Sequence, residues 1–187
     1  SVRNVNGQEA IFLHNGGSIE VVARSKNSGR GFTVDVLVLD EAQELDDDAL
    51  EALMPTTSAA PLGNPQWIYT GTPPGPFAKG AVFTRTRTDA LSTKPKPYRL
   101  TWAEWSSETN TDLDNMDEVI LTNPGIASGR LQMDVIKGER ARYSPDGFAR
   151  ERRGWWRSDM GADGPFPEGS WAAGIDATSR IAANSRR

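Results

Sequence analysis

The sequence predicts an α/β fold, in which a sheet with flanking helices is followed by a small, mostly helical subdomain. Residues 34–39 form an almost unbroken run of Val and Leu that ends in two acids, and residues 66–69 form a second apolar run that ends in polar residues. Such runs are typical of strands covered on both faces, as in a parallel sheet between helices. From about residue 112 onward, the apolar residues recur at helical spacing.

The length of 187 residues suits one globular core with appendages. We expect residues 1–105 to form the domain that contains the sheet and residues 106–158 to form a helical linker subdomain. Residues 159–187 are rich in Gly, Ala, Ser and Pro and are expected to form a flexible connector.

Composition excludes several classes of protein. The chain has no cysteine and a single histidine, His14, which excludes disulfides, thiolate metal sites and histidine-rich metal sites. It has no apolar stretch of about 20 residues and no signal-peptide pattern, so we expect no membrane span and a cytoplasmic location. The formal net charge of -4 argues against a protein that coats nucleic acid.

The first elements are predicted from apolar spacing and turn residues. Residues 10–13 and 19–22 form a hairpin around a Gly-rich turn, and both strands are expected to be partly buried. Residues 45–54 form a helix that is stopped by Pro55. The acidic run 46–48 is expected to start this helix rather than to bind a metal.

The later elements are predicted in the same way. They are, in order, a helix over 77–91, a strand over 98–102, and helices over 116–121, 131–143 and 145–156. The last three helices make up the helical subdomain, whose Met and Trp side chains are expected to form its core rather than a binding site.

Residues 36–41, Val-Leu-Val-Leu-Asp-Glu, fit a Walker B strand, which consists of four apolar residues followed by two acids. A buried strand holds the carboxylates rigidly, so that Asp40 can help to hold Mg²⁺ and Glu41 can polarise an attacking water. The alternative is a buried strand that ends in an acidic helix cap. The motif alone leaves both interpretations open.

Thr70-Gly71-Thr72 directly follows the second apolar run. Ligands of open α/β sheets bind beyond the carboxyl ends of the strands, where hydroxyl groups can respond to the terminal phosphate of a nucleotide. The alternative is an ordinary turn, which Gly71 and Pro73 also favour.

Several short motifs follow one another along the chain. They are Ala23-Arg24-Ser25, Arg30-Gly31, Leu39-Asp40-Glu41-Ala42-Gln43, Tyr69-Thr70-Gly71-Thr72-Pro73, Asn123-Pro124-Gly125, Phe148-Ala149-Arg150-Glu151 and Gly154-Trp155-Trp156. Their order and spacing resemble the large terminase subunit of tailed double-stranded DNA phages, roughly from the hairpin to Trp171. The resemblance implies part of a P-loop ATPase sheet of the ASCE type.

The resemblance assigns roles to individual residues. Asp40 matches the acid that is associated with Mg²⁺, through water, and Glu41 matches the carboxylate that activates water. Thr70, Gly71 and Thr72 match the motif that couples hydrolysis to movement.

For three further residues, the sequence leaves two alternative roles. Arg30 lies where some members of the family place an arginine finger that acts on the neighbouring subunit, and a solvated loop arginine is the alternative. Gln43 is assigned either to the nucleotide site or to the capping of a helix. Arg24 fits a structural ion pair better than a finger.

In that family the subunit uses ATP and Mg²⁺ to package double-stranded DNA into the capsid, in the cytoplasm of the bacterial host. The implied partners are double-stranded DNA, the portal protein, the small terminase subunit and further copies of the subunit in a homo-oligomeric ring. No membrane is implied.

Two parts of the family's machinery do not occur in this sequence. No lysine is followed by Ser or Thr, so the chain has no Gly-x-x-x-x-Gly-Lys-Ser/Thr loop to cradle phosphates. The family also has a C-terminal nuclease domain, which we expect to be absent from this chain. We therefore expect the phosphate loop upstream of Ser1, on another polypeptide or nowhere, and we expect the isolated chain to be inactive and to bind neither ATP nor Mg²⁺ tightly.

Two other functions remain open from the sequence. Half of a DExD/H-box helicase-like ATPase would require a second α/β domain after residue 101, and a non-catalytic remnant would bind the portal or the small subunit. The basic segment 137–157, which also contains aromatic residues, either binds DNA or keeps its arginines solvated on packed helices.

Overall fold

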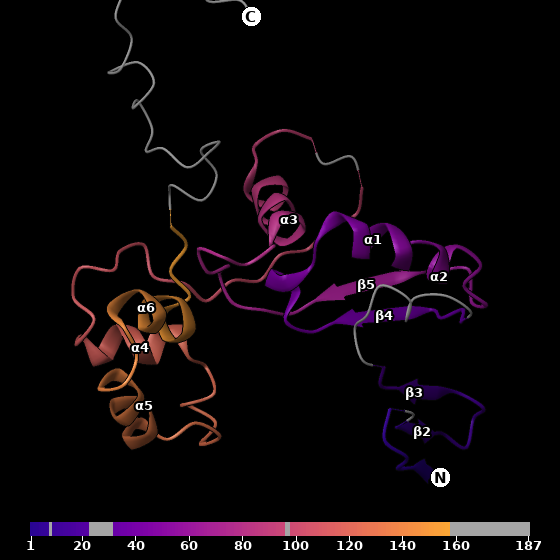
Figure 1. Ribbon diagram of the computed structural model, residues 1–187, viewed down its shortest axis with the longest axis horizontal. Coiled ribbons are helices and arrows are strands. Elements are labelled where there is room, and N and C mark those ends of the chain that lie inside the picture. The colour runs from indigo at the N-terminus through magenta and orange to yellow at the C-terminus, as the bar shows by residue number, and fades with distance from the viewer. Residues whose placement is uncertain (8, 23–31, 96–97, 158–187) are drawn as a thin grey trace, which may run out of the picture.

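The computed structural model describes residues 1–7, 9–22, 32–95 and 98–157. These residues form a three-stranded antiparallel sheet, a two-stranded parallel sheet with helices against it, and a group of helices near the C-terminal end of the described chain (Figure 1). The α/β class is confirmed at this level. Within the described residues, no helix is long and apolar enough to cross a membrane.

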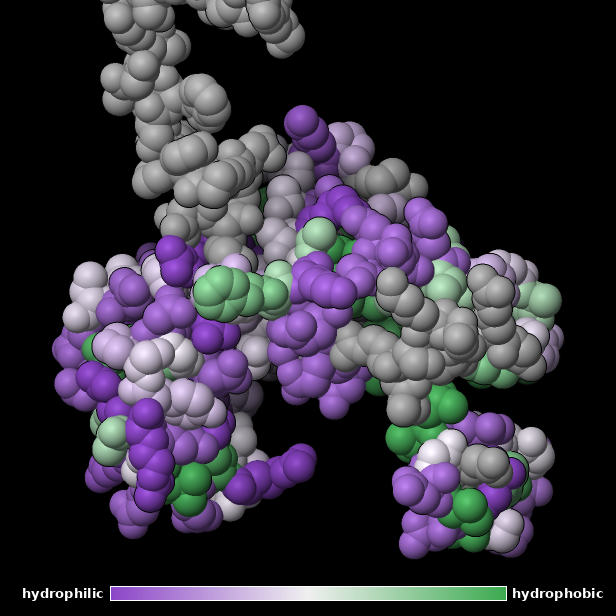
Figure 2. Space-filling model, in the orientation of Figure 1, coloured by the Kyte–Doolittle hydropathy of each residue, from purple (hydrophilic) through white to green (hydrophobic). Residues whose placement is uncertain are grey.

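The antiparallel sheet confirms the predicted hairpin. It consists of β1 (Val2–Arg3), β2 (Ala10–Phe12) and β3 (Ser18–Glu20), with Ile11 opposite Ile19. The expectation that both strands are partly buried is wrong. Only Ala10 is buried in β2 and β3, and hydrophobic surface is visible on this sheet in Figure 2, because no described element covers it.

The parallel sheet pairs β4 (Val36–Leu39) with β5 (Gln66–Tyr69), in a register that sets Leu39 beside Tyr69. Alternate side chains of a strand point to opposite faces of the sheet. On one face, Leu37, Leu39, Trp67 and Tyr69 pack into a core with residues of the neighbouring helices. This face therefore anchors both strand ends.

The opposite face of the parallel sheet is open. Val36, Val38 and Ile68 are 45%, 58% and 43% exposed. The prediction that the run 34–39 is covered on both faces is therefore wrong for the described chain. The apolar run is present, but described helices pack only on the other face.

The helices around the parallel sheet are η1 (Ala42–Glu44), α1 (Asp47–Leu53), α2 (Pro55–Ser58) and α3 (Ala81–Leu91). Asp46 caps α1, because its side chain accepts a hydrogen bond of 2.9 Å from the amide of Ala49. The acidic run therefore starts a helix, as predicted. Pro55 does not end the helical path, since it is the first residue of α2, where a missing amide hydrogen costs nothing.

The predicted strand over 98–102 is wrong. These residues have no partner strand and run as irregular chain. Trp102 packs its ring on Phe83 of α3 at 5.4 Å between centroids, and its indole N–H donates to Glu104 at 2.7 Å. Side-chain contacts thus hold this segment in place of strand pairing.

A helix is present in each of the three segments predicted near the C-terminal end, and the three helices together are named the helical subdomain. Its helices are α4 (Met116–Thr122), α5 (Met133–Arg140) and α6 (Pro145–Arg153), which bury a core of Leu113, Val119, Ile136, Phe148 and Ala149. Ser144 caps α6 and Gly154 ends it with a left-handed backbone, φ 56°. Two of the three helices are shorter than predicted, because their last residues turn out of the helical path.

Candidate active site at the strand ends

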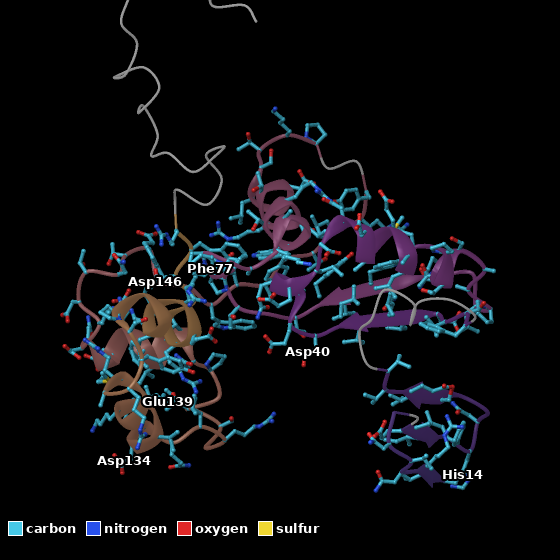
Figure 3. All side chains as sticks on the ribbon, in the orientation of Figure 1. His14, Asp40, Phe77, Asp134, Glu139 and Asp146 are labelled. Carbon is cyan, nitrogen blue, oxygen red and sulfur yellow. The ribbon has the colours of Figure 1, made fainter. Side chains whose placement is uncertain are left out.

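The two parallel strands end side by side, and their polar extensions touch. The hydroxyl of Thr70 donates to Oδ1 of Asp40 at 2.6 Å, and the amide of Ala42 donates to the carbonyl of Thr70 at 2.8 Å. Figure 3 shows Asp40 at the end of β4, on the side of the sheet that faces the helical subdomain. The sheet register therefore places an acid and a hydroxyl from two strands at one point.

Glu41 has an unusual backbone. Its φ of 53° and ψ of 49° lie in the left-handed region, and among the described residues it is the only one besides glycine with a positive φ. This conformation costs a residue with a Cβ roughly 1–2 kcal/mol. Strain of this kind persists only where the surroundings fix the chain, and it is concentrated at functional sites.

Gln43 connects the two strand ends. Its side chain is 8% exposed. Its Nε2 donates to Oε2 of Glu41, and its Oε1 accepts from the amide of Thr72 at 3.2 Å. Both polar atoms of the amide are therefore used inside the protein.

The segment 70–80 packs closely on η1 and reaches the helical subdomain. A Cβ at Gly71 would collide with Oε1 of Gln43, and one at Gly80 would lie 2.6 Å from the carbonyl oxygen of Gln43. A Cβ at Gly75 would lie 3.1 Å from a guanidinium nitrogen of Arg150 in α6. In the same segment, the ring of Phe77 is 97% exposed and lies between the sheet and the helical subdomain (Figure 3).

The strand ends suit a cation that arrives with phosphates. Mg²⁺ at nucleotide sites is held by one or two carboxylates, phosphate oxygens and waters. Asp40 supplies one exposed carboxylate, with the hydroxyl of Thr70 beside it. The described part of the chain contains no group of three or more His, Asp or Glu that could hold a metal by itself.

Most of the site residues predicted from the sequence come together here. The structure gathers Asp40, Glu41, Gln43, Thr70, Gly71 and Thr72 into one bonded cluster. Arg30 and Arg24 lie outside the described residues. Sequence reasoning missed the double contact of Gln43, for which the only signal was an amide two residues after the second acid.

The basic segment 137–157 is largely neutralised within the protein. Arg140 pairs with Asp114 at 3.0 Å, Arg150 with Asp146 at 3.2 Å, and Arg152 with Glu139 at 2.5 Å. Arg153 is fully buried and pairs with Glu118. These pairs favour the structural interpretation of the segment over a DNA-binding surface.

An aromatic cluster joins α3 to the chain after α6. Phe83 lies 5.4 Å from Trp102 and 5.7 Å from Trp156, between ring centroids. The guanidinium of Arg87 sits 4.6 Å from the ring centroid of Trp156 and forms two hydrogen bonds with Glu104, at 2.7 and 2.8 Å.

The electrostatics of this cluster favour a charged Glu104. Burial acts to raise the pKa of Glu104, but the hydrogen bonds from Arg87, Ser106 and Trp102 outweigh it and lower that pKa. The ion pair between Arg87 and Glu104 is therefore part of the contact between α3 and the chain that follows α6.

Comparison with protein-family models, with curated proteins and with solved structures found no match for this chain.

Proposed function

We propose that the chain is part of a large terminase subunit and carries the water-activating and coupling half of its ATPase site. The observation that supports this most directly is the meeting of Asp40 and Glu41 at the end of β4 with Thr70-Gly71-Thr72 at the end of β5. Both groups were expected at one edge of a parallel sheet, and they share a 2.6 Å hydrogen bond. In this proposal the protein works in the cytoplasm of the bacterial host.

The residues at the strand ends have distinct tasks in this proposal. Asp40, which Thr70 orients, would hold the Mg²⁺ of an ATP complex, and the metal would neutralise phosphate charge. Glu41 is exposed and would accept a proton from the attacking water. Thr70 to Thr72 would report the state of the terminal phosphate to segment 70–80, which reaches Arg150 of α6.

The open face of the parallel sheet fits a site that is completed by other polypeptide. Val36, Val38 and Ile68 are apolar and exposed, whereas strands of α/β sheets are normally covered on both faces. The sequence also contains no phosphate-binding loop. A segment that brings this loop and covers this face would meet both needs.

The helices after the sheet argue against the helicase alternative. A helicase-like ATPase would continue into a second α/β domain, but the described residues 98–157 contain helices and irregular chain without a strand.

The proposed partners are those of the terminase family: double-stranded DNA, the portal protein, the small terminase subunit and further copies in a ring. Because arginines of the segment 137–157 are paired with acids, we assign this segment no role in DNA binding.

The test is ATP hydrolysis by the 187-residue chain mixed with a separately expressed segment that bears the phosphate-binding loop, proposed to be encoded upstream. We expect turnover only in the mixture. Glu41→Gln should lower that turnover by about 10²- to 10⁴-fold, since a positioned general base contributes this much.

Glu44→Gln is the matched control, because Glu44 is an exposed acid of η1 whose side chain forms no hydrogen bond with Gln43 or Thr70. It should leave turnover unchanged. A well-folded mixture without turnover would contradict the proposal and favour a non-catalytic module that binds the portal or the small subunit.

A further inference from the structure

The side chain of Gln43 is placed to act on Glu41 rather than on a nucleotide. It is 8% exposed, donates to the Glu41 carboxylate and accepts from the amide of Thr72 at 3.2 Å. We propose that Gln43 is a positioning residue, which sets the orientation of the Glu41 carboxylate and ties it to the backbone of the Thr70–Thr72 segment. This inference rests on the proposed ATPase function of the same site.

The chemistry of the two contacts explains why an amide stands at this position. An ionised carboxylate only accepts hydrogen bonds, and a backbone amide only donates them. A primary amide offers a donor and an acceptor on one planar group, so Gln43 can serve both partners at once. The opposite orientation of the amide would turn its oxygen toward Glu41 and its NH₂ toward the N–H of Thr72, so the network fixes one orientation.

The packing around Gln43 is shaped to hold this orientation. A Cβ at Gly71 would collide with the Gln43 oxygen and would lie 3.4 Å from the ring of Phe83. The glycine therefore leaves the space that the amide oxygen needs in order to reach Thr72. On the other side, Glu41 presents its carboxylate from a left-handed backbone, φ 53°. Both partners of Gln43 are thus fixed by features of the main chain.

The link has a direct consequence for the reaction. Because one side chain contacts both Glu41 and Thr72, a shift of the Thr70–Thr72 segment changes the hydrogen bonding of the water-activating carboxylate. Gln43 thereby couples the two halves of the proposed site. A residue that only stabilised the fold would not make this connection.

The first experiment replaces Gln43 by Met, which fills a similar volume without either hydrogen bond. In the active mixture we expect kcat to fall by about 10- to 100-fold, as when supporting contacts of a reactive group are lost, while KM for ATP stays near its original value. Thr56→Val is the matched control. Thr56 is 3% exposed, donates to Leu53 at 2.7 Å and accepts through its carbonyl from the amide of Val34. It therefore lies near the start of β4 rather than at its end, so Thr56→Val should lower stability without changing kcat.

The second variant, Gln43→Glu, separates positioning from packing. When ionised, the introduced carboxyl repels Glu41 and lacks the donor, whereas in its protonated form it offers a donor and an acceptor again. We expect kcat, relative to Gln43→Met at each pH, to rise as the pH falls. Among the described residues, the charged groups on Gln43's own turn and on the segments packed against it are Asp40, Glu41 and Glu44, Lys79 of segment 70–80, which pairs with Asp46, and Arg85 of α3, which pairs with Asp47.

A third readout does not depend on turnover. In the 187-residue chain alone, hydrogen exchange of the Thr72 amide should be faster in Gln43→Met than in the unchanged chain and unaffected in Thr56→Val. Unchanged kcat in Gln43→Met, in a mixture that is otherwise active, would overturn the positioning role alone. An inactive mixture with a protected Thr72 amide would instead overturn the proposed function, and with it the catalytic consequence of the link.

Discussion

The strand ends of the parallel sheet and the helical subdomain both contain acids, yet they place them differently. At the strand ends, Asp40 and Glu41 are exposed, and Asp40 accepts a hydrogen bond from Thr70 while Glu41 accepts one from Gln43. In the helical subdomain, Glu118 and Glu139 pair with Arg153 and Arg152. The first arrangement sets acids at the solvent-exposed ends of two strands, and the second uses acids to hold helices together.

The difference indicates where stability and reactivity are located in this protein. Pairing an acid with a buried arginine stabilises the fold only while both partners are present. An exposed acid at a strand end contributes little to stability, since ionic contacts at a protein surface are worth about 0–1 kcal/mol. Substitutions in the helical subdomain should therefore act on stability, and substitutions at the strand ends should act on activity.

The largest effect is expected for Arg153→Met. Arg153 is fully buried, pairs with Glu118 and donates to the hydroxyl of Ser107 at 2.9 Å. Removing one partner of a buried ion pair costs about 3–5 kcal/mol of unfolding free energy. Urea denaturation followed by tryptophan fluorescence measures this loss.

The control is Arg130→Met, at an exposed arginine of the same region. It should change the unfolding free energy by no more than about 0.5 kcal/mol. Equal losses in the two variants would show that the buried network does not hold the helical subdomain.

A smaller loss is expected for Gly154→Ala. Gly154 has φ 56°, and a Cβ there would collide with the carbonyl oxygen of Trp105. Gly129, with φ 73° and open space around it, gives the matched variant Gly129→Ala, which costs about 1 kcal/mol for the left-handed backbone alone.

The collision should add about 1–3 kcal/mol to the loss in Gly154→Ala, as overpacking does elsewhere. Thermal unfolding of the two variants side by side measures the difference. If they lose the same stability, the close approach of Gly154 and Trp105 is not maintained in solution.

Acidification should also weaken the helical subdomain. Hydrogen bonds from Ser107 and Arg153 hold the pKa of Glu118 below its ordinary value of 4.5, although burial acts in the opposite direction. A lowered pKa in the folded state stabilises the fold above the unfolded value, and that stability is lost as the pH falls through the folded pKa. We therefore expect the unfolding free energy to decrease below pH 4.5.

Glu118→Gln should show a weaker pH dependence in this window, and Glu108→Gln, at an exposed acid nearby, should keep the original one. Part of the dependence remains in Glu118→Gln, because the pKa of Glu104 is lowered as well. Identical profiles for the two variants would assign the acid sensitivity to other groups.

The smallest change in stability is expected for Glu41→Asn. Asn tolerates the left-handed backbone better than Glu, so relief of strain should keep the unfolding free energy unchanged or raise it by up to about 1 kcal/mol. ATP hydrolysis by the mixture should nevertheless be lost, because the shorter amide cannot accept the proton of water. A destabilisation of more than about 1 kcal/mol would mean that Glu41 holds the fold, which would remove the contrast between the two regions.

The helical spacing and the turn residues made much of the fold predictable. The hairpin at β2 and β3, the two parallel strands and the three helices of the subdomain follow local patterns of apolar residues. The strand over 98–102 could not be rejected in this way. Its residues favour a strand, but the segment is held by side-chain packing instead, since Trp102 packs against Phe83 of α3.

In the candidate site, too, some features could be predicted from the sequence and others depend on tertiary packing. Asp40, Glu41 and Thr70 were predicted to lie together because parallel strands end at one edge of their sheet. The bridge through Gln43 was not predictable, since its two partners are two and 29 residues away and the contact with Thr72 needs the space left by Gly71.

Local patterns in the sequence were enough to predict most of the strands and helices and the polar residues that follow the strands, because these depend on periodicity and on short-range caps. Tertiary packing, by contrast, leaves Val36 and Val38 exposed, pairs the arginines of α5 and α6 with acids, and gives Glu41 a left-handed backbone. Each of these outcomes depends on which distant groups lie within a few ångströms, and spacing along the chain does not encode that distance.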